Sequence, residues 1–255
     1  MRTLRLQLLI LLLAAGAARG EIPDGWNSDY RASLAQAKTN QQPVLIYFTA
    51  SWCGPCKRMA RTTFKEETIL KVLEPILHLA LDIDEQPILA EQHGIRAVPT
   101  FQIVLSSGTP VATLTGFQEP APLIEWLTNN LVLAKATIAR QEQFTRQFAA
   151  AELLLQQTDS AARSNAISGL LELCAGPGEG LRDKASARLS SLPPEDLPWV
   201  LQGLNHPALA VRIQAANLMR VRAGDVFDID PWSDAATRQK SVTEWRARMP
   251  SLNLK

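Results

Sequence analysis

The chain has 255 residues, of which 46% are hydrophobic and 20% charged, and its formal net charge is +1. This length and composition support two modest domains, each with a buried core. Beyond residue 20 there is no polybasic patch, so nucleic acids and anionic membranes are poor candidate partners.

The first 20 residues have the pattern of a cleaved secretory signal peptide. Arg2 and Arg5 precede an apolar run over residues 6–13, and small residues follow at 14–18. A basic start, a short apolar run and small residues near the cleavage point define such a signal. A membrane-spanning helix needs about 20 residues, so an uncleaved anchor is the less favoured alternative. We therefore expect a secreted or periplasmic protein that begins near Glu21.

Residues 21–133 alternate between helix and strand patterns. An amphipathic helix is expected to end by residue 38, with Asn27 or Ser28 as its N-cap, and the apolar run 44–48 indicates a buried strand. Further along the chain the patterns predict short helices over 69–74 and 86–93, a strand over 76–83, a hairpin of strands 100–105 and 111–114, and a helix over 121–130. A strand-helix-strand unit followed by a hairpin gives a mixed sheet with helices on both faces.

The sequence Ser51-Trp52-Cys53-Gly54-Pro55-Cys56-Lys57 lies where the strand 44–48 turns into a helix. At a helix N-terminus, unpaired backbone N–H groups and the helix dipole stabilise a thiolate, so the pKa of Cys53 is expected to fall below that of a free thiol. Cys56 lies one helical turn further on, where it can resolve a mixed disulfide. The motif therefore predicts disulfide exchange.

A zinc half-site and an inert cysteine pair are the alternatives. Zinc usually requires two more ligands, and Cys174, His78, His93 and His206 form no second paired motif. Redox chemistry is therefore favoured, and we expect neither a metal nor a cofactor. Cys174 has apolar neighbours at helical spacing and is expected to be a buried thiol. His93 is interpreted as a surface residue near a helix end.

Three motifs resemble those of the thioredoxins and related thiol-disulfide oxidoreductases. The first is the cysteine motif, the second is the stretch Gly94-Ile95-Arg96-Ala97-Val98-Pro99-Thr100-Phe101, and the third is Thr115-Gly116-Phe117. The resemblance covers roughly residues 26 to 131. It implies an α/β thioredoxin fold, in which helices flank a mixed central sheet. Exported thioredoxin-like domains, such as the terminal domain of DsbD, are the more similar members.

The resemblance also implies roles for individual residues. Cys53 attacks a substrate disulfide, and Cys56 resolves the mixed disulfide. Pro99 follows a cis peptide bond, faces the cysteine pair and keeps it from binding metal, while Val98 offers backbone hydrogen bonds to a substrate. The residues expected to contact substrate are Trp52, Gly54, Pro55, Val98, Pro99 and Gly116.

One departure concerns the buried acid of the family. Thioredoxins place an aspartate six residues before the first cysteine, and this chain has Tyr47 there, with Ala80 where the partner lysine often lies. The change removes a general base and an anion that would raise the cysteine pKa values. Water, Glu85 and Glu91 are the alternatives for the base.

The predicted activity is that of an exported protein-disulfide oxidoreductase. Its Gly-Pro dipeptide resembles that of reducing thioredoxins, which favours a reductase. The sequence carries no flavin or dinucleotide fingerprint, so a membrane or envelope protein must exchange electrons with it. Its substrates are protein thiols and disulfides.

Residues 134–255 predict an all-helical second domain, because alanine, leucine, arginine and glutamine dominate there. The segment 204–216 resembles a HEAT-type repeat, and a plain helical bundle is the alternative. Three carboxylates in the loop 224–232 do not match an EF-hand, so a turn that packs Phe227 and Trp232 onto the helices is favoured over a metal site.

Two other function classes remain open. In the first, the helical domain binds a partner as an envelope adaptor or scaffold, and the redox domain regulates it. In the second, the protein is a chaperone that uses the substrate groove without turnover.

Overall fold

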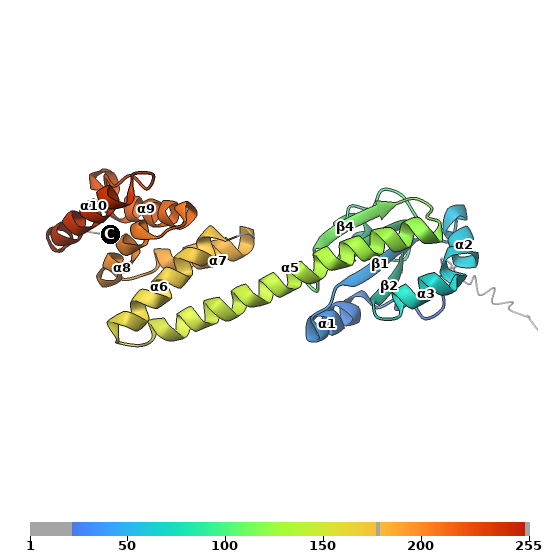
Figure 1. The fold of residues 1–255 in the computed structure, drawn as a ribbon. Helices are drawn as coiled ribbons and strands as arrows, with labels where there is room; N and C mark the ends of the chain where they lie inside the picture. The colour runs from blue at the N-terminus through green and yellow to red at the C-terminus, as the bar shows by residue number, and fades with distance from the viewer. Residues whose placement is uncertain (1–21, 177–178, 253–255) are drawn as a thin grey trace, which may run out of the picture. The chain divides into compact units, whose positions relative to one another are not determined.

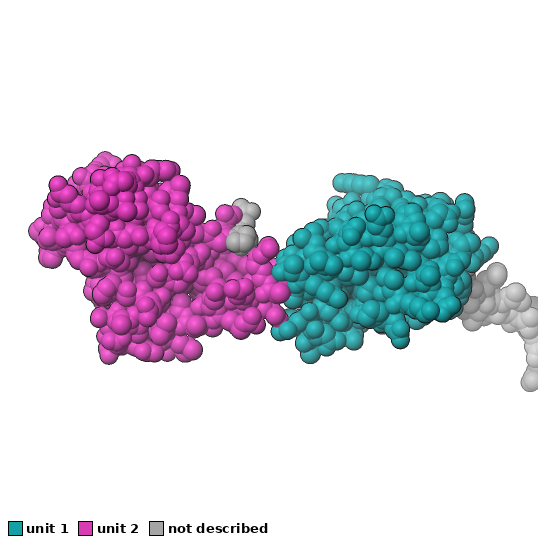
Figure 2. All heavy atoms as spheres, in the orientation of Figure 1, with its two compact units in different colours: residues 1–138 teal, residues 139–255 magenta. Residues whose placement is uncertain are grey.

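The computed structural model describes residues 22–176 and 179–252 (Figure 1). The predicted signal peptide lies outside the described residues. Within them, no helix combines the length and the apolar character that a membrane span requires. The chain divides into two compact units, residues 1–138 and 139–255 (Figure 2).

The first unit is built on a four-stranded mixed sheet, which confirms the predicted fold. Its strand order is β2-β1-β3-β4, in which β1 and β2 run parallel and the other two pairs are antiparallel. The strands are β1 (Val44–Thr49), β2 (Leu77–Asp82), β3 (Thr100–Val104) and β4 (Pro110–Thr115). The helices are α1 (Tyr30–Asn40), α2 (Gly54–Arg61), α3 (Glu67–Leu73), α4 (Pro87–Gln92) and α5 (Pro120–Leu155), with a 3-10 turn η1 at Thr63–Lys65.

Side chains that alternate along β1 divide the core of this unit into two layers. Leu45 and Tyr47 point to the face that carries α2, α3 and α5, and both cysteines of the motif join that apolar cluster. Ile46 and Phe48 point to the opposite face, against α1 and α4. The cysteine motif therefore packs on the face of the sheet that carries Leu45 and Tyr47.

Two helix predictions were wrong. The N-cap of α1 is Asp29, whose Oδ1 accepts a hydrogen bond of 2.9 Å from the backbone N–H of Ala32. The helix predicted to end at residue 130 continues to Leu155 as α5, because residues 123–155 contain neither glycine nor proline to stop it. The predicted domain boundary between residues 133 and 134 thus lies inside α5.

The second unit is helical in its described residues, as predicted. It contains the end of α5 and the helices α6 (Ser160–Ala175), α7 (Glu179–Ser190), α8 (Leu197–Gln202), α9 (Leu209–Ala223) and α10 (Ala235–Arg248). The 3-10 turns η2 (Pro194–Asp196), η3 (Gly203–Asn205), η4 (Gly224–Val226) and η5 (Met249–Ser251) complete it. Asp196 is 1% exposed and pairs with Arg163, whose Nε donates to Asp196 Oδ1 over 2.8 Å.

The loop between α9 and α10 fits its prediction only in part. Phe227 is buried and meets the Trp245 ring edge-on at 5.1 Å between centroids. Trp232 is 62% exposed, so the expectation that it packs onto the helices was wrong. Two carboxylates of the loop are engaged in hydrogen bonds, Asp228 with the Trp245 indole and Asp230 with the Trp232 backbone N–H.

Candidate active site

Cys53 and Cys56 form a disulfide at the start of α2, with their Cα atoms 5.2 Å apart. Cys53 is the N-cap of the helix, and its Sγ accepts a hydrogen bond of 3.1 Å from the backbone N–H of Cys56. The first N–H groups of a helix have no partner within the helix. The Cys56 N–H is therefore placed to stabilise a Cys53 thiolate once the disulfide is reduced.

The short sequence around the disulfide fixes the entry into α2. The backbone N–H of Cys53 donates to the carbonyl of Ala50 over 3.1 Å, and the Cys53 carbonyl accepts from Lys57 over 3.1 Å. Pro55 stands in the first turn, where its missing N–H costs no helical bond. Cys53 and Cys56 are buried, while Gly54 and Pro55 between them are exposed. A partner protein therefore reaches the disulfide over Gly54 and Pro55.

Trp52 forms an exposed rim beside the disulfide. Its side chain is 64% exposed, as expected for a residue that flanks the site. The indole Nε1 donates a hydrogen bond of 2.8 Å to Asp84 Oδ2, just beyond the end of β2. Asp84 in turn donates its backbone N–H to the buried Asp82 carboxylate over 2.9 Å. Sequence reasoning missed Asp84, since nothing in the motif marks it as a partner of Trp52.

The second motif forms a loop that ends on β3. The Val98–Pro99 peptide bond is cis, as the resemblance implied. Val98 is half-buried and packs against the apolar cluster that contains both cysteines. The Pro99 carbonyl accepts a hydrogen bond of 2.8 Å from the Gly116 N–H, so the structure brings the second and third motifs together. Gly116 has a φ of 99°, a conformation that L side chains rarely adopt.

The third motif is tied to the helix that carries the cysteines. The guanidinium of Arg58 on α2 lies 4.4 Å from the centroid of the Phe117 ring and pairs with Glu119 over 3.4 Å. Thr63 is fully buried, and its hydroxyl donates to the Gln118 carbonyl over 2.7 Å. The loop after Gly116 is thus anchored to α2 and to the turn that follows it.

Aromatic packing takes the place of the family's buried aspartate. Tyr47 is 0% exposed and stacks on Phe101 with 5.0 Å between ring centroids. Trp26 and Phe64 meet the Tyr47 ring edge-on at 5.7 and 5.1 Å. Ala80, at the lysine position, is paired with Tyr47 across the parallel strands. This layer beneath the cysteines is therefore aromatic.

Glu85 and Glu91, the two alternative bases, are both exposed. The cysteine pair is buried, so neither residue shares its environment.

His93 does not lie on the surface as expected. The side chain is half-buried, and its ring bonds to both Tyr30 and Gln102. The prediction was wrong because the end of α4 packs onto β3, where a buried amide faces the imidazole. Gln102, a glutamine inside an otherwise apolar strand, was the sign in the sequence that a polar partner packs there.

Cys174 on α6 is buried, as predicted. Burial raises the pKa of its thiol to about 11, because desolvation disfavours the thiolate. Its Sγ lies 3.9 Å from the Arg182 carbonyl. A thiol with a raised pKa is a poor nucleophile at neutral pH, so this cysteine does not resemble the redox pair.

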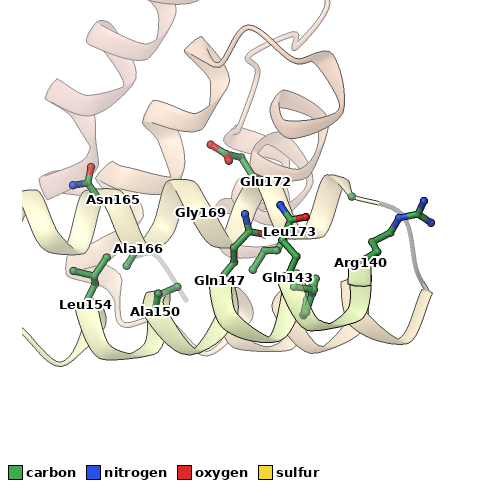
Figure 3. A pocket seen from close by; sticks show the side chains of 13 residues that line it. Arg140, Gln143, Gln147, Ala150, Leu154, Asn165, Ala166, Gly169, Glu172 and Leu173 are labelled. Carbon is green, nitrogen blue, oxygen red and sulfur yellow. The ribbon is translucent and has the colours of Figure 1, made fainter. Parts of the chain in front are cut away.

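A groove of about 500 Å³ lies between α5 and α6 in the second unit (Figure 3). Phe144, Ala151 and Leu173 contribute its apolar surface. Gln143 and Gln147 rise from α5 toward α6, as Figure 3 shows. The groove has the size of a ligand or peptide site.

The comparisons with known proteins concern the first unit. The Thioredoxin family model matches residues 26–129. The thioredoxin of Rickettsia bellii is 35% identical over 89 residues, which are 35% of this chain and 82% of that protein. The thioredoxin of Alicyclobacillus acidocaldarius is 38% identical over 87 residues, covering 34% of this chain and 80% of that protein. The oxidised DsbD C-terminal domain of Neisseria meningitidis is 25% identical, with a TM-score of 0.37, and covers 41% of this chain and 98% of that chain.

Proposed function

This chain belongs to the thioredoxin family, and we propose that within that family it is an exported reductase of protein disulfides. The Cys53–Cys56 pair makes it a thiol-disulfide oxidoreductase. The proposal rests above all on the position of that pair, which lies at a helix N-terminus behind an exposed rim of Trp52, Gly54 and Pro55.

The chemistry follows from the reduced form of the pair. The Cys53 thiolate attacks one sulfur of a substrate disulfide, so a mixed disulfide forms and one substrate thiolate leaves. Cys56 then loses its proton and attacks Cys53 Sγ, which releases the second substrate thiolate. Two electrons pass to the substrate, and the Cys53–Cys56 disulfide remains. With Tyr47 at the family's aspartate position, the proton of Cys56 passes to water or to the departing thiolate.

The substrate surface in this proposal runs around the disulfide. Trp52, Gly54 and Pro55 would form one side of it, and Val98 and Gly116 the other, while Pro99 itself is buried. The Gly116–Pro99 hydrogen bond supports this arrangement, because it places the last two loops next to each other. A substrate strand would pair with the Val98 backbone.

The direction and the electron source belong to the same proposal. The Gly54-Pro55 dipeptide favours a reductase. In an oxidising compartment outside the cytoplasm, such a reductase would have to receive two electrons per turnover from a membrane or envelope protein. Export rests on the pattern of residues 1–20. Mass measurement of the protein's N-terminus after expression in a Gram-negative host tests it, with cleavage after residue 17, 18 or 20 expected. Retention of Met1 together with recovery of the protein in the cytoplasmic fraction would contradict export, whereas Met1 on a membrane-bound protein would indicate the uncleaved anchor.

The activity is tested with the mature chain, residues 21–255, in reduction of insulin by dithiothreitol. Acceleration that Cys53→Ser abolishes is the expected result. Cys56→Ser should instead accumulate mixed disulfides, since the resolving thiol is absent. Equal insulin reduction with Cys53→Ser would refute the proposal.

The groove between α5 and α6 favours a second candidate, in which the helical unit is an adaptor for a partner protein. A helical unit of this kind usually presents a surface. Complementation of a deletion strain separates the two functions. Rescue by Cys53→Ala together with no rescue by Gly169→Phe, which fills the groove, would establish the adaptor. The opposite pattern is expected for the reductase.

A further inference from the structure

Three side chains from separate elements form a continuous hydrogen-bonded chain in the first unit. Tyr30 lies at the start of α1, His93 at the end of α4, and Gln102 in the middle of β3. Tyr30 Oη lies 2.9 Å from His93 Nε2, and His93 Nδ1 lies 2.7 Å from Gln102 Oε1. The Gln102 Nε2 amide also donates to the His93 carbonyl over 3.0 Å. We call these three residues the clasp.

The direction of each bond in the clasp follows from its chemistry. Gln102 donates its amide N–H to a carbonyl, so its Oε1, which only accepts, faces the ring of His93. Nδ1 therefore donates to Gln102 Oε1, and Nε2 forms the second hydrogen bond of the ring, with the Tyr30 hydroxyl. Both ring nitrogens of His93 are thus engaged.

The clasp is enclosed by apolar packing, which makes its bonds costly to break. Gln102 is 3% exposed and lies on the sheet face that carries Phe48, whose ring is 5.4 Å from the His93 ring. A buried amide that loses its partner keeps its desolvation penalty. The turn before β4 closes the other end, because a Cβ at Gly108 would lie 2.6 Å from Tyr30 Oη. Apolar packing and the Gly108 turn therefore enclose the clasp from both ends.

The clasp closes the loop that carries the second motif. His93 and Gln102 stand on either side of residues 94–101, so their two mutual hydrogen bonds join the beginning of this loop to its end. Inside the loop, the Thr100 hydroxyl donates to the Ala97 carbonyl over 2.8 Å. Neither these bonds nor the Gly116–Pro99 bond uses the backbone of Val98, and among the described residues no other backbone hydrogen bond occupies it.

We propose that Tyr30, His93 and Gln102 are positioning residues that hold Val98 and Pro99 for protein substrates. The clasp lies on the sheet face opposite the cysteines, so it acts on substrate binding rather than on the thiols. This inference rests on the proposed function, in which the Val98 backbone pairs with a substrate. Small displacements of positioning groups can change rates by about 100-fold.

The kinetic test compares two disulfides with the mature chain and its Gln102→Leu and Tyr30→Phe variants. Insulin has a main chain that pairs with Val98, whereas 5,5′-dithiobis(2-nitrobenzoate) has none. For Gln102→Leu we expect about a 10-fold rise in KM for insulin with kcat unchanged, and a rate with the small disulfide within about twofold of the wild type. Tyr30→Phe, which removes one bond and keeps the ring, should show a smaller rise.

Ile69→Ala is the matched control, because Ile69 is fully buried in the same unit, on the other face of the sheet. It should lower the unfolding midpoint at least as much as the clasp variants and leave the KM for insulin unchanged. An equal KM rise in the control would show that lost stability, not positioning, explains the effect. Equal losses with both disulfides would also overturn the proposal.

Backbone hydrogen exchange supplies a readout that needs no turnover. Loss of the clasp should accelerate exchange of the amides in residues 94–98 selectively, and Ile69→Ala should not. If the wild type fails to reduce insulin but this local acceleration occurs, the proposed function fails and the positioning role stands. Unchanged exchange in residues 94–98 of both clasp variants would overturn the positioning role itself. Tyr30→Phe decides the question if Gln102→Leu does not fold.

Discussion

Replacement of Tyr47 tests whether packing is the role of the residue that stands at the family's aspartate position. Tyr47→Ala removes a fully buried ring with three aromatic partners whose centroids lie 5.0 to 5.7 Å away. Truncation of a buried aromatic side chain costs about 3–5 kcal/mol. Aromatic pairs add about 0.5–1.5 kcal/mol each, so with three such partners we expect a loss of at least about 5 kcal/mol in the free energy of unfolding.

Tyr47→Phe keeps the ring and its contacts, so it is the matched control. Its loss should stay below about 1.5 kcal/mol, because only the hydroxyl is removed and the buried ring remains. The rate of insulin reduction should stay within about twofold of the wild type, because the ring and not the hydroxyl supports the cysteines.

Slow hydrogen exchange of the β1 amides measures this free energy for the first unit alone. Exchange at these amides reports the stability of the first unit separately from that of the helical unit, whereas a global unfolding curve combines the two. A loss below about 2 kcal/mol for Tyr47→Ala would refute the packing argument. So would a tenfold fall in insulin reduction for Tyr47→Phe, since that would assign chemistry to the hydroxyl.

Three further outcomes follow from the structure. Burial raises the pKa of the Cys174 thiol from 9.0 to about 11, so iodoacetamide should label this residue at pH 8 only after unfolding. The stability that the buried neutral thiol contributes should be complete below pH 9 and should fall as the pH rises toward 11. Rapid labelling of the folded, oxidised protein would contradict this. Arg163→Ala should lower the free energy of unfolding of the helical unit by about 3–5 kcal/mol, measured by slow hydrogen exchange of the α6 amides, because the Asp196 carboxylate stays buried without its partner. Gly116→Ala should cost the first unit about 1–3 kcal/mol, measured by slow exchange of the β1 amides, from its φ of 99° alone, since a Cβ there meets nothing within 4 Å.

The parts of the structure that sequence reasoning predicted well are those with local signals. Alternating and continuous apolar runs indicated the strands, and the cysteine motif after β1 indicated a helix N-terminus. The disulfide, the exposed Trp52 and the buried Cys174 follow from that local information. They depend on neighbours in the chain, which a sequence shows directly.

The parts that escaped prediction depend on contacts between distant residues. Surface exposure was expected for His93, yet its two partners lie 63 and 9 residues away along the chain. The continuity of α5 through residues 131–134 was missed because a composition change was taken for a break. Trp232 was expected to be buried because it is aromatic, but it is exposed. Phe227 is the aromatic residue of this loop that packs against the helices.

The reduction potential of the Cys53–Cys56 pair tests the central claim most directly. Equilibration of residues 21–255 with dithiothreitol buffers measures it, and the fraction of disulfide is read by thiol labelling of the unfolded chain followed by mass spectrometry. Cys174 provides the internal reference for a thiol outside the couple. A reductase should have a potential near −270 mV, about that of thioredoxin. A potential near −120 mV, about that of the oxidant DsbA, would contradict the proposed direction of electron flow.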